Sequence, residues 1–290
     1  MLKKVLLGLV ITIIVLIIIG LSGIYAVGAW NLVFPNRTHD SIAPTLPKNL
    51  PQPAILVFSK TNGFRHTDGI AGGNAFFAKL ANQNGWGLFA TENGAVFNTE
   101  DLAKFDTVIF NSASGDMLSD EQEIAFQQWL ENGGGWLGMH ASGDGSHKDW
   151  TWYQQTMFNV DYLAHIMNPQ FQTATVNLEN IDHPVLADIP TRWQHEEEWY
   201  SWEESPRRQN ITVLATIDED TYTPVADFMG KQTDLHMGDH PIIWARCVNK
   251  GRAVYSAVGH RAIAFNVPEI TQLLENVINW TNGTTGDHCQ

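Results

Sequence analysis

Cysteine is scarce in this chain of 290 residues, where only Cys247 and Cys289 are present. Two cysteines cannot form the disulfide framework that holds many small exported folds together. Cys247 lies in an apolar run and Cys289 in a polar tail, so a bridge between them is possible but has no support in the sequence. The fold must therefore depend on a hydrophobic core, for which a hydrophobic content of 44% is ordinary.

Positive charge is also scarce, with 17 Lys and Arg residues against 31 Asp and Glu residues and a net charge of −14. Without Lys3 and Lys4, which precede an apolar segment, 15 basic and 31 acidic residues remain, a balance of −16. A surface this acidic repels phosphate backbones and other polyanions. Nucleic acid is therefore excluded as an expected partner.

One long stretch, Val5 to Ile24, carries no charge. A helix of that length spans roughly 30 Å, the thickness of a bilayer's hydrocarbon core. Two lysines precede it, so we expect a membrane anchor over residues 1–30, with the remaining chain outside the cytoplasm, in the periplasm or the extracellular space. A cleaved secretory signal ending at Val27-Gly28-Ala29 is the alternative, but the apolar run exceeds the usual signal core of roughly 7–15 residues.

Residues 31–53 contain five prolines, at positions 35, 44, 47, 51 and 53. Proline disfavours both helix and sheet, so the segment is predicted to be an extended tether between the anchor and the domain that follows.

Residues 54–282 alternate between short apolar runs and amphipathic stretches. Strands are expected at 54–59, 86–91, 107–111, 136–140, 174–178, 211–217, 242–247 and 253–258. Helices are expected before Gly85, after the capping box Ser119-Asp-Glu-Gln122, and from Pro268. The alternation predicts a flavodoxin-like, doubly wound, mostly parallel α/β domain, and residues 283–290 are expected to form a disordered tail.

Histidines gather beyond the carboxyl ends of the expected strands, where open parallel sheets bind ligands. Thr61-Asn-Gly-Phe-Arg-His66 follows the first strand, His140 closes the fourth with Asp144 just after it, and Gly259-His260 follows the last. His240 precedes the strand at 242–247. Each alone is commonly a structural histidine, but their joint occurrence predicts a site at one edge of the sheet.

Gly138-Met-His140-Ala-Ser142 has the sharp strand-to-helix form of a nucleophile elbow. The side chain presented there is histidine, which can transfer protons, bind a metal or donate a hydrogen bond, but cannot replace a thiol or hydroxyl nucleophile in acyl transfer. Neither cysteine is near this turn and Ser142 is offset from it, so covalent chemistry is not expected here.

The acidic run Glu196-Glu-Glu198 precedes Trp199 and Tyr200. Three successive carboxylates usually form a solvated loop. Interleaved with aromatic rings, they also supply the mixture of groups that a sugar site uses. Both interpretations stay open, and Glu198 is the carboxylate favoured for a functional role.

At these motifs the chain resembles the ThuA-like (trehalose utilisation) family, whose fold is similar to that of class I glutamine amidotransferases. The matching stretches run in order through residues 54–282 and include Phe58–His66, Gly133–Ala141 with Asp144, Trp150–Tyr153, His183-Pro184, Glu197–Tyr200, His240–Trp244 and Gly251–His260. By position, His140 occupies the site of the amidotransferase cysteine and His260 falls near its catalytic histidine. The resemblance therefore implies sugar metabolism without glutamine amidotransferase activity. Ser142 and Glu197 depart from the family's common Ala and Asp.

Together, these observations predict an exported domain that processes a carbohydrate, either a glycoside or an oxidised sugar, as a hydrolase, lyase or isomerase. His140 and His260 are the predicted acid–base groups, with Asp144 as a third catalytic residue. The predicted substrate-binding residues are Arg65, His66, Glu198, Trp199, Tyr200 and His240. A non-catalytic carbohydrate-binding protein on the same anchor is the alternative.

Imidazoles and carboxylates together also suit a divalent metal such as Zn²⁺. The candidate ligands are His66, His140, His240, His260, Asp144 and Glu198. No pair has a compact spacing such as His-x-x-x-His, so the fold would have to bring every ligand together. The sequence therefore leaves two alternatives, a metal or direct hydrogen bonds from these side chains to sugar hydroxyls.

Overall fold

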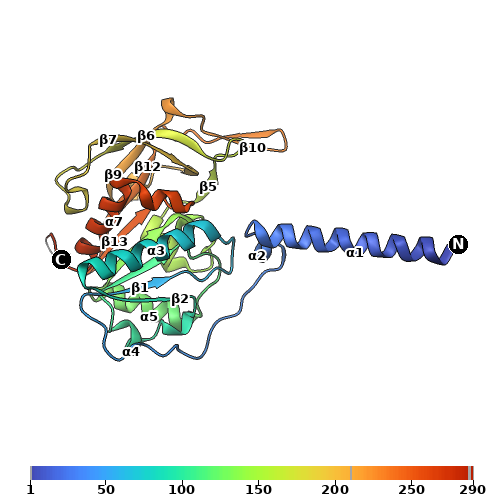
Figure 1. The fold of residues 1–290 in the computed structure, drawn as a ribbon. Helices are drawn as coiled ribbons and strands as arrows, with labels where there is room; N and C mark the ends of the chain where they lie inside the picture. The colour runs from blue at the N-terminus through green and yellow to red at the C-terminus, as the bar shows by residue number, and fades with distance from the viewer. Residues whose placement is uncertain (1, 210, 287–288, 290) are drawn as a thin grey trace.

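The computed structural model describes residues 2–209, 211–286 and 289. Its centre is a nine-stranded mixed sheet with the order β2-β1-β3-β4-β13-β12-β9-β6-β7. Helices cover the sheet, and one helix projects away from it (Figure 1). The predicted α/β fold class is confirmed, with a parallel half and an antiparallel half.

The parallel half of the sheet contains the first four strands and the last one. They are β1 (Ala54–Phe58), β2 (Gly87–Thr91), β3 (Thr107–Asn111), β4 (Gly135–Met139) and β13 (Gly251–Ser256). All four pairings among them are parallel. Four of the five strands are buried along their whole length, as continuous apolar runs are in a parallel sheet covered on both faces.

The antiparallel half extends the sheet beyond β13. It consists of β12 (Pro241–Val248), β9 (Thr212–Asp218), β6 (Gln172–Leu178) and β7 (Arg192–Glu197). Two small sheets accompany it, β5 (Tyr162–His165) with β8 (Tyr200–Trp202), and the hairpin of β10 (Val225–Phe228) and β11 (Lys231–Asp234). The sequence did not predict β5, β7, β8, β10 or β11.

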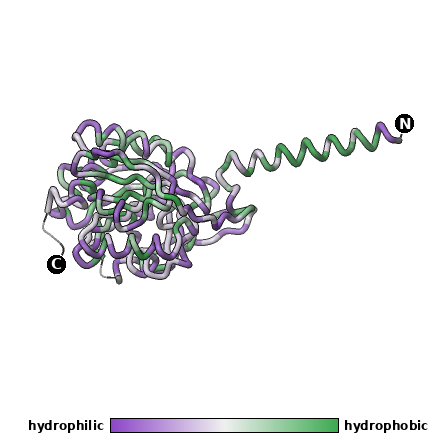
Figure 2. Tube along the Cα trace, turned by 90° about the horizontal axis from the view of Figure 1, so that it is seen from below, coloured by the Kyte–Doolittle hydropathy of each residue, from purple (hydrophilic) through white to green (hydrophobic). Residues whose placement is uncertain are grey.

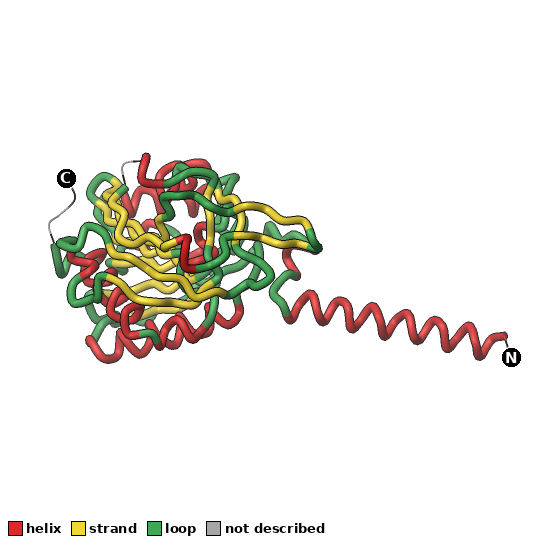
Figure 3. Tube along the Cα trace, turned by 90° about the horizontal axis from the view of Figure 1, so that it is seen from above, coloured by secondary structure: helices red, strands yellow, loops and turns green. Residues whose placement is uncertain are grey.

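The helices pack on opposite faces of the parallel half (Figure 3). The domain helices are α3 (Thr67–Asn84), α4 (Thr99–Leu102), α5 (Asp120–Glu131), α6 (Thr151–Tyr153) and α7 (Pro268–Thr281). Successive residues of β3 point to opposite faces, because Phe110 stacks on Phe126 of α5 whereas Asn111 donates to Asn74 of α3. The predicted capping box at Ser119 is present, and it starts α5.

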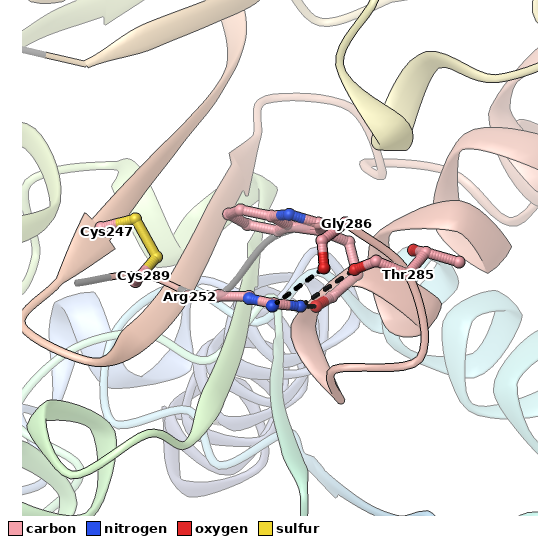
Figure 4. Close-up of a disulfide and its surroundings, with 6 residues drawn as sticks. Cys247, Arg252, Thr285, Gly286 and Cys289 are labelled. Carbon is pink, nitrogen blue, oxygen red and sulfur yellow. Dashed lines mark hydrogen bonds between the residues drawn. A yellow bond between two sulfur atoms is a disulfide. The ribbon is translucent and has the colours of Figure 1, made fainter.

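Disorder was expected for residues 283–290, but the described part of this tail contacts the domain. Cys247 and Cys289 form a disulfide with their Cα atoms 5.6 Å apart. Arg252 of β13 donates to the carbonyl oxygens of Thr285 and Gly286 (Figure 4). These contacts hold the described tail residues 283–286 and 289 against the sheet; residues 287, 288 and 290 lie outside the described part of the chain.

The N-terminal segment forms α1 (Leu2–Ala26) and the short α2 (Trp30–Val33). Helix α1 points away from the domain and is apolar along almost its whole length (Figure 2). By length and composition, residues Lys3–Ala26 could cross a membrane, and none of this stretch is buried in the protein. The segment is therefore a candidate membrane anchor or signal sequence.

The predicted tether, residues 31–53, begins inside α2 instead of being extended throughout, and residues 35–53, which form no helix or strand, are not a free spacer. The Asp40 carboxylate lies 2.6 Å from Lys60 Nζ and accepts from the Gly94 amide, and Gln122 donates to the Asp40 carbonyl. Leu46 and Leu50 pack against the core. The prediction of a tether is corrected: this segment lies along the domain because its few apolar and charged side chains find partners there.

Candidate functional site

His140 follows β4 at the predicted sharp turn. Its backbone adopts φ of 44°, a left-handed conformation that costs a non-glycine residue about 1–3 kcal/mol. The Tyr255 hydroxyl donates to the His140 carbonyl at 2.9 Å, and His140 Nδ1 lies 2.8 Å from the Ala257 carbonyl. The turn therefore holds both the backbone and the ring of a fully buried histidine.

Glu197 and Glu198 leave the end of β7 in different directions. Glu197 accepts the amide of Gly259 at 2.8 Å, which fixes the loop carrying His260. Glu198 turns toward His140 and is 1% exposed. The interpretation of this acidic run as a solvated loop is therefore wrong for these two residues, while Glu196 is exposed and pairs with Arg261 at 2.5 Å.

Three side chains from distant parts of the chain meet at one point. Glu198 Oε2 lies 3.3 Å from His140 Nε2 and 3.0 Å from His260 Nδ1, and those two nitrogens are 3.0 Å apart. The His66 ring stands edge-on to both His140 and His260, with centroids 4.5 and 4.7 Å away. One ligand atom of each of these four residues lies within 4.8 Å of all the others. We call these four residues the histidine–glutamate cluster.

If all three histidines of the cluster are neutral, nothing balances the negative charge of Glu198. The Ala257 carbonyl can only accept, so His140 Nδ1 carries a hydrogen and Nε2 of a neutral ring presents a lone pair. That lone pair would face a carboxylate oxygen at 3.3 Å. A proton or a metal cation among these atoms would remove the repulsion between this lone pair and the carboxylate, whereas with neutral rings the Tyr200 hydroxyl and a hydrogen on His260 Nδ1 would have to satisfy them.

The directions of the pKa shifts in the cluster follow from the same charges and burial. Burial would lower the pKa of His140, but the hydrogen bond and charge of Glu198 outweigh burial and raise it. Burial would raise the pKa of Glu198, but His140 and His260 hold it well below its ordinary value. Burial and the two neighbouring histidines lower the pKa of His66 well below its ordinary value, so this ring is neutral and one of its nitrogens has a lone pair for a cation.

The spacing of the donor atoms is close to that of a tetrahedral zinc site and slightly shorter. Zinc bonds to nitrogen and oxygen ligands are about 2.0–2.2 Å long, so neighbouring ligand atoms in a tetrahedron are about 3.3–3.6 Å apart. The three separations among His140, Glu198 and His260 are 3.0–3.3 Å. In addition, His66 Nδ1 is buried without a hydrogen-bond partner. His140 also donates its other ring nitrogen to a backbone carbonyl, as metal-binding histidines commonly do.

A pocket of about 350 Å³ opens onto the cluster. Its walls include Leu32, Phe64, Asp144, Tyr162 and His165. A second pocket of about 370 Å³ shares Phe64, His66 and His260 with the first. The cluster is thus accessible from two adjoining pockets.

Several of the predicted site residues line these pockets. Tyr200 places its hydroxyl 3.0 Å from His140 Nε2. Burial raises the pKa of Asp144, which lines the main pocket and accepts the amide of Ser146 at 2.9 Å. Arg65 lines the second pocket, where it pairs with Glu92 at 2.6 Å.

Two predicted substrate-binding residues are not exposed to either pocket. Trp199 is fully buried and donates its indole N–H to the Gln172 carbonyl, so its ring does not face a sugar in either pocket. His240 is also buried, 2.7 Å from the Tyr200 carbonyl and 2.8 Å from Glu219. It does not line the pockets but positions Tyr200, because its two ring nitrogens contact the Tyr200 carbonyl of β8 and the Glu219 carboxylate.

Sequence reasoning missed a group of pocket residues around Glu198. Gln170 donates to Glu198 Oε1 at 2.5 Å, and His165 Nδ1 lies 3.2 Å from the same oxygen. Both belong to residues 159–171, which have no clear hydrophobic period. The only signal was compositional, a histidine and a glutamine among aromatic residues.

Comparisons with known proteins agree with this architecture. The family model described as ThuA, trehalose utilisation, matches residues 54–281. A ThuA-like protein from Bacteroides uniformis is 24% identical, with a TM-score of 0.69, over 82% of this chain and 95% of its own. A ThuA-like protein from Parabacteroides merdae is 16% identical, with a TM-score of 0.60, over 80% of this chain and 90% of its own. At these identities the structural similarity shows the fold alone.

None of the curated proteins matches the chain. The family model, however, covers well over half of the sequence, in the range that the resemblance predicted. The chain belongs to the ThuA family.

Proposed function

We propose that this ThuA-family domain processes a carbohydrate, a glycoside or an oxidised sugar, by acid–base chemistry at the histidine–glutamate cluster. The observation that carries the proposal is the convergence of three imidazoles and one buried carboxylate at a pocket. Its volume of about 350 Å³ is at the small end of ligand sites and suits one or two sugar rings. The carbohydrate is inferred from the family description, trehalose utilisation.

In an alternative form of this proposal, the cluster holds a divalent ion, zinc first, instead of transferring the proton itself. His66, His140, Glu198 and His260 would hold it, since their donor atoms have the identity and spacing that zinc prefers. A bound ion supplies polarisation of a substrate oxygen. Without an ion, His140 and His260 would themselves transfer protons to and from the substrate. With the ion in place, Asp144 and His165 remain as pocket groups that can move protons.

The burial of the tryptophans favours an enzyme over the alternative, a non-catalytic carbohydrate-binding protein. A pure binder holds sugar rings against exposed aromatic faces. Trp199 and Trp202, which follow the acidic run, are both at most 1% exposed. Among the described residues, those that line the two pockets include no tryptophan, and their aromatic side chains are Phe64 and the tyrosines at positions 162 and 200. The cluster instead concentrates groups suited to proton transfer.

We also propose that the domain is exported and remains attached to the membrane. Helix α1 supports an anchor by its length and composition. The Cys247–Cys289 disulfide supports an oxidising compartment, because such bonds persist mainly outside the cytoplasm. Recovery of membrane-bound protein that retains its N-terminal residues would test this part.

Turnover by the full chain in detergent tests the chemistry. A panel of glycosides and 3-keto-glycosides should contain at least one compound that is converted, as detected by mass spectrometry. His140→Ala should reduce its kcat at least 100-fold, whereas His236→Ala, which alters an exposed histidine outside the site, should leave it unchanged. Tight sugar binding without turnover would instead establish the binding protein, and absence of both would reject the carbohydrate.

A further inference from the structure

We propose that the pocket takes its substrate from a lipid bilayer, so that the substrate is a neutral glycolipid whose sugar head group reaches the histidine–glutamate cluster. This inference rests on the proposed carbohydrate function and on α1 as a membrane span. Two observations support it: the end of α1 lies beside the pockets, and an apolar hairpin, β10–β11, projects from the same side of the domain.

The end of α1 is fixed to the loop that carries His66. The Arg65 amide donates to the Gly28 carbonyl at 2.9 Å, and the Asn31 side chain donates to the Thr61 carbonyl at 2.7 Å. Gly28 adopts φ of 81°, and a Cβ placed there would lie 2.1 Å from the Arg65 carbonyl oxygen. The approach is thus a backbone contact that only glycine permits.

The same segment forms part of both pocket walls. Ala26 and Val27, at the end of α1, line the second pocket, and Leu32 of α2 lines the main pocket. Val33 and Phe34 continue this apolar stretch and are exposed. If α1 crosses a bilayer, these residues lie at its surface, with the pocket mouths directly beside them.

The hairpin of β10 and β11 supplies the second apolar element. Its tip exposes Phe228 at 65% and Met229 at 91%, and Lys231 follows. The hairpin projects from the side of the domain from which α1 departs, in both views (Figures 1 and 3). Exposed aromatic and thioether side chains beside a lysine are typical of a loop that enters the interfacial region of a membrane.

The base of this hairpin is joined to the pocket wall. Met167, which lines the main pocket, donates its amide to the Val225 carbonyl at 3.2 Å and accepts from the Asp227 amide at 3.1 Å. The pocket is therefore bordered by the anchor on one side and connected to the hairpin on the other. When both elements contact one leaflet, the pocket faces that leaflet.

A glycolipid fits this arrangement better than a free sugar. Its head group can enter the main pocket and reach the polar atoms of the histidine–glutamate cluster, while its acyl chains stay in the bilayer beside Leu32 and the exposed apolar residues. The net charge of −14 for the whole chain disfavours anionic lipids. A neutral glycosyl head group avoids this electrostatic repulsion.

The first experiment measures contact with the bilayer. Both native cysteines are in the disulfide, so Met229→Cys in the full chain would carry the only free thiol, and a bimane label there reports lipid contact. In phosphatidylcholine vesicles, brominated lipid should quench this label at least threefold more than the same label on Ile124→Cys, an exposed apolar position on α5. Equal, weak quenching at both positions would overturn the proposed orientation.

The second experiment tests the substrate class. Monoglucosyl and monogalactosyl diacylglycerol in vesicles are compared with their deacylated, soluble head groups. The full chain should convert a vesicle substrate at least tenfold faster, and Phe228→Ser/Met229→Ser should lower that rate at least fivefold while leaving the soluble head group's rate within twofold. Equal or faster conversion of the soluble head group would overturn the glycolipid inference. Failure to convert either form counts against the proposed carbohydrate function, and the quenching result still decides the orientation.

Discussion

Glu198→Gln should remove a metal from the site while leaving the fold intact. Glu198 is the only anionic member of the histidine–glutamate cluster, and its side chain is 2% exposed. Glutamine has the same shape and can still hydrogen-bond Gln170 and His165. The substitution therefore removes a charge and little else from the centre of the site.

The expected loss of zinc affinity follows from the position of the carboxylate. Groups that only support a ligand typically contribute 10–100-fold to metal affinity. Glu198 Oε2 is 3.0–3.3 Å from two imidazole nitrogens, close to the separation of about 3.3–3.6 Å between neighbouring ligands on one zinc ion. Its loss should weaken binding at least 100-fold, about 2.7 kcal/mol. Protein purified without a histidine tag should hold about one zinc per chain.

The assay is elemental analysis after dialysis against a weak chelator. Wild-type protein should retain zinc, and Glu198→Gln should retain less than about 0.1 equivalent, given a 100-fold weaker site. Glu196→Gln is the matched control, because it makes the same charge change two residues away on an exposed side chain paired with Arg261. Wild-type protein without zinc, or equal loss from both variants, would refute the metal.

A metal-free cluster would have a different signature. The positive charge among His140, Glu198 and His260 would then be a proton, and removal of the carboxylate would remove the main cause that raises the pKa of His140. The His140 pKa measured by NMR would fall in Glu198→Gln. The two measurements on one variant therefore distinguish the two possible cations.

Three further outcomes follow from other parts of the chain. Serine at both cysteine positions opens a loop spanning 42 residues and should lower the free energy of unfolding by up to about 4 kcal/mol, measured by urea denaturation; unchanged stability would contradict a formed bridge. Burial and nearby aspartates raise the pKa of Glu123 to about 7, so the free energy of unfolding should fall as pH rises from about 4.5 to 7. Glu123→Gln should therefore raise the free energy of unfolding by about 1–2 kcal/mol at pH 8, after allowance for solvent screening, and should not change it at pH 4. Gly28→Ala should speed hydrogen exchange at the Arg65 amide, whereas Gly85→Ala, with similar φ but open space around it, should not.

The parallel half of the fold was predictable from the sequence because its signals are local. Each strand there is a short apolar run, and the three long helices of the domain carry a glycine stop (α3), a capping box (α5) or a proline start (α7). The antiparallel half was less predictable. β7 alternates exposed and buried positions, but its buried set includes His195 and Glu197, so its pattern does not look hydrophobic.

The candidate site was predictable as a set of residues at strand ends, but not as a geometry. His140, His260 and His66 follow three parallel strands, and the rule for such sheets brings them to one edge. Glu198 comes from the antiparallel half, whose position no local pattern specified. The same limit explains why the burial of Trp199 was not predicted. Side chains alternate between the two faces of a strand, so a shift of one residue after β7 changes whether a side chain faces the pocket or the core.

The backbone at His140 links this geometry to function. A left-handed conformation in a non-glycine residue persists only where its surroundings enforce it, and here Tyr255 and Ala257 hold the residue from two sides. Both partners belong to β13 or the residues just after it, the same stretch that leads to His260. The strand that fixes the strained turn thus also leads to the second histidine, whose Nδ1 lies 3.0 Å from His140 Nε2. Two imidazoles held by backbone contacts around one buried carboxylate supply the fixed geometry that a metal site or a proton-transfer site requires.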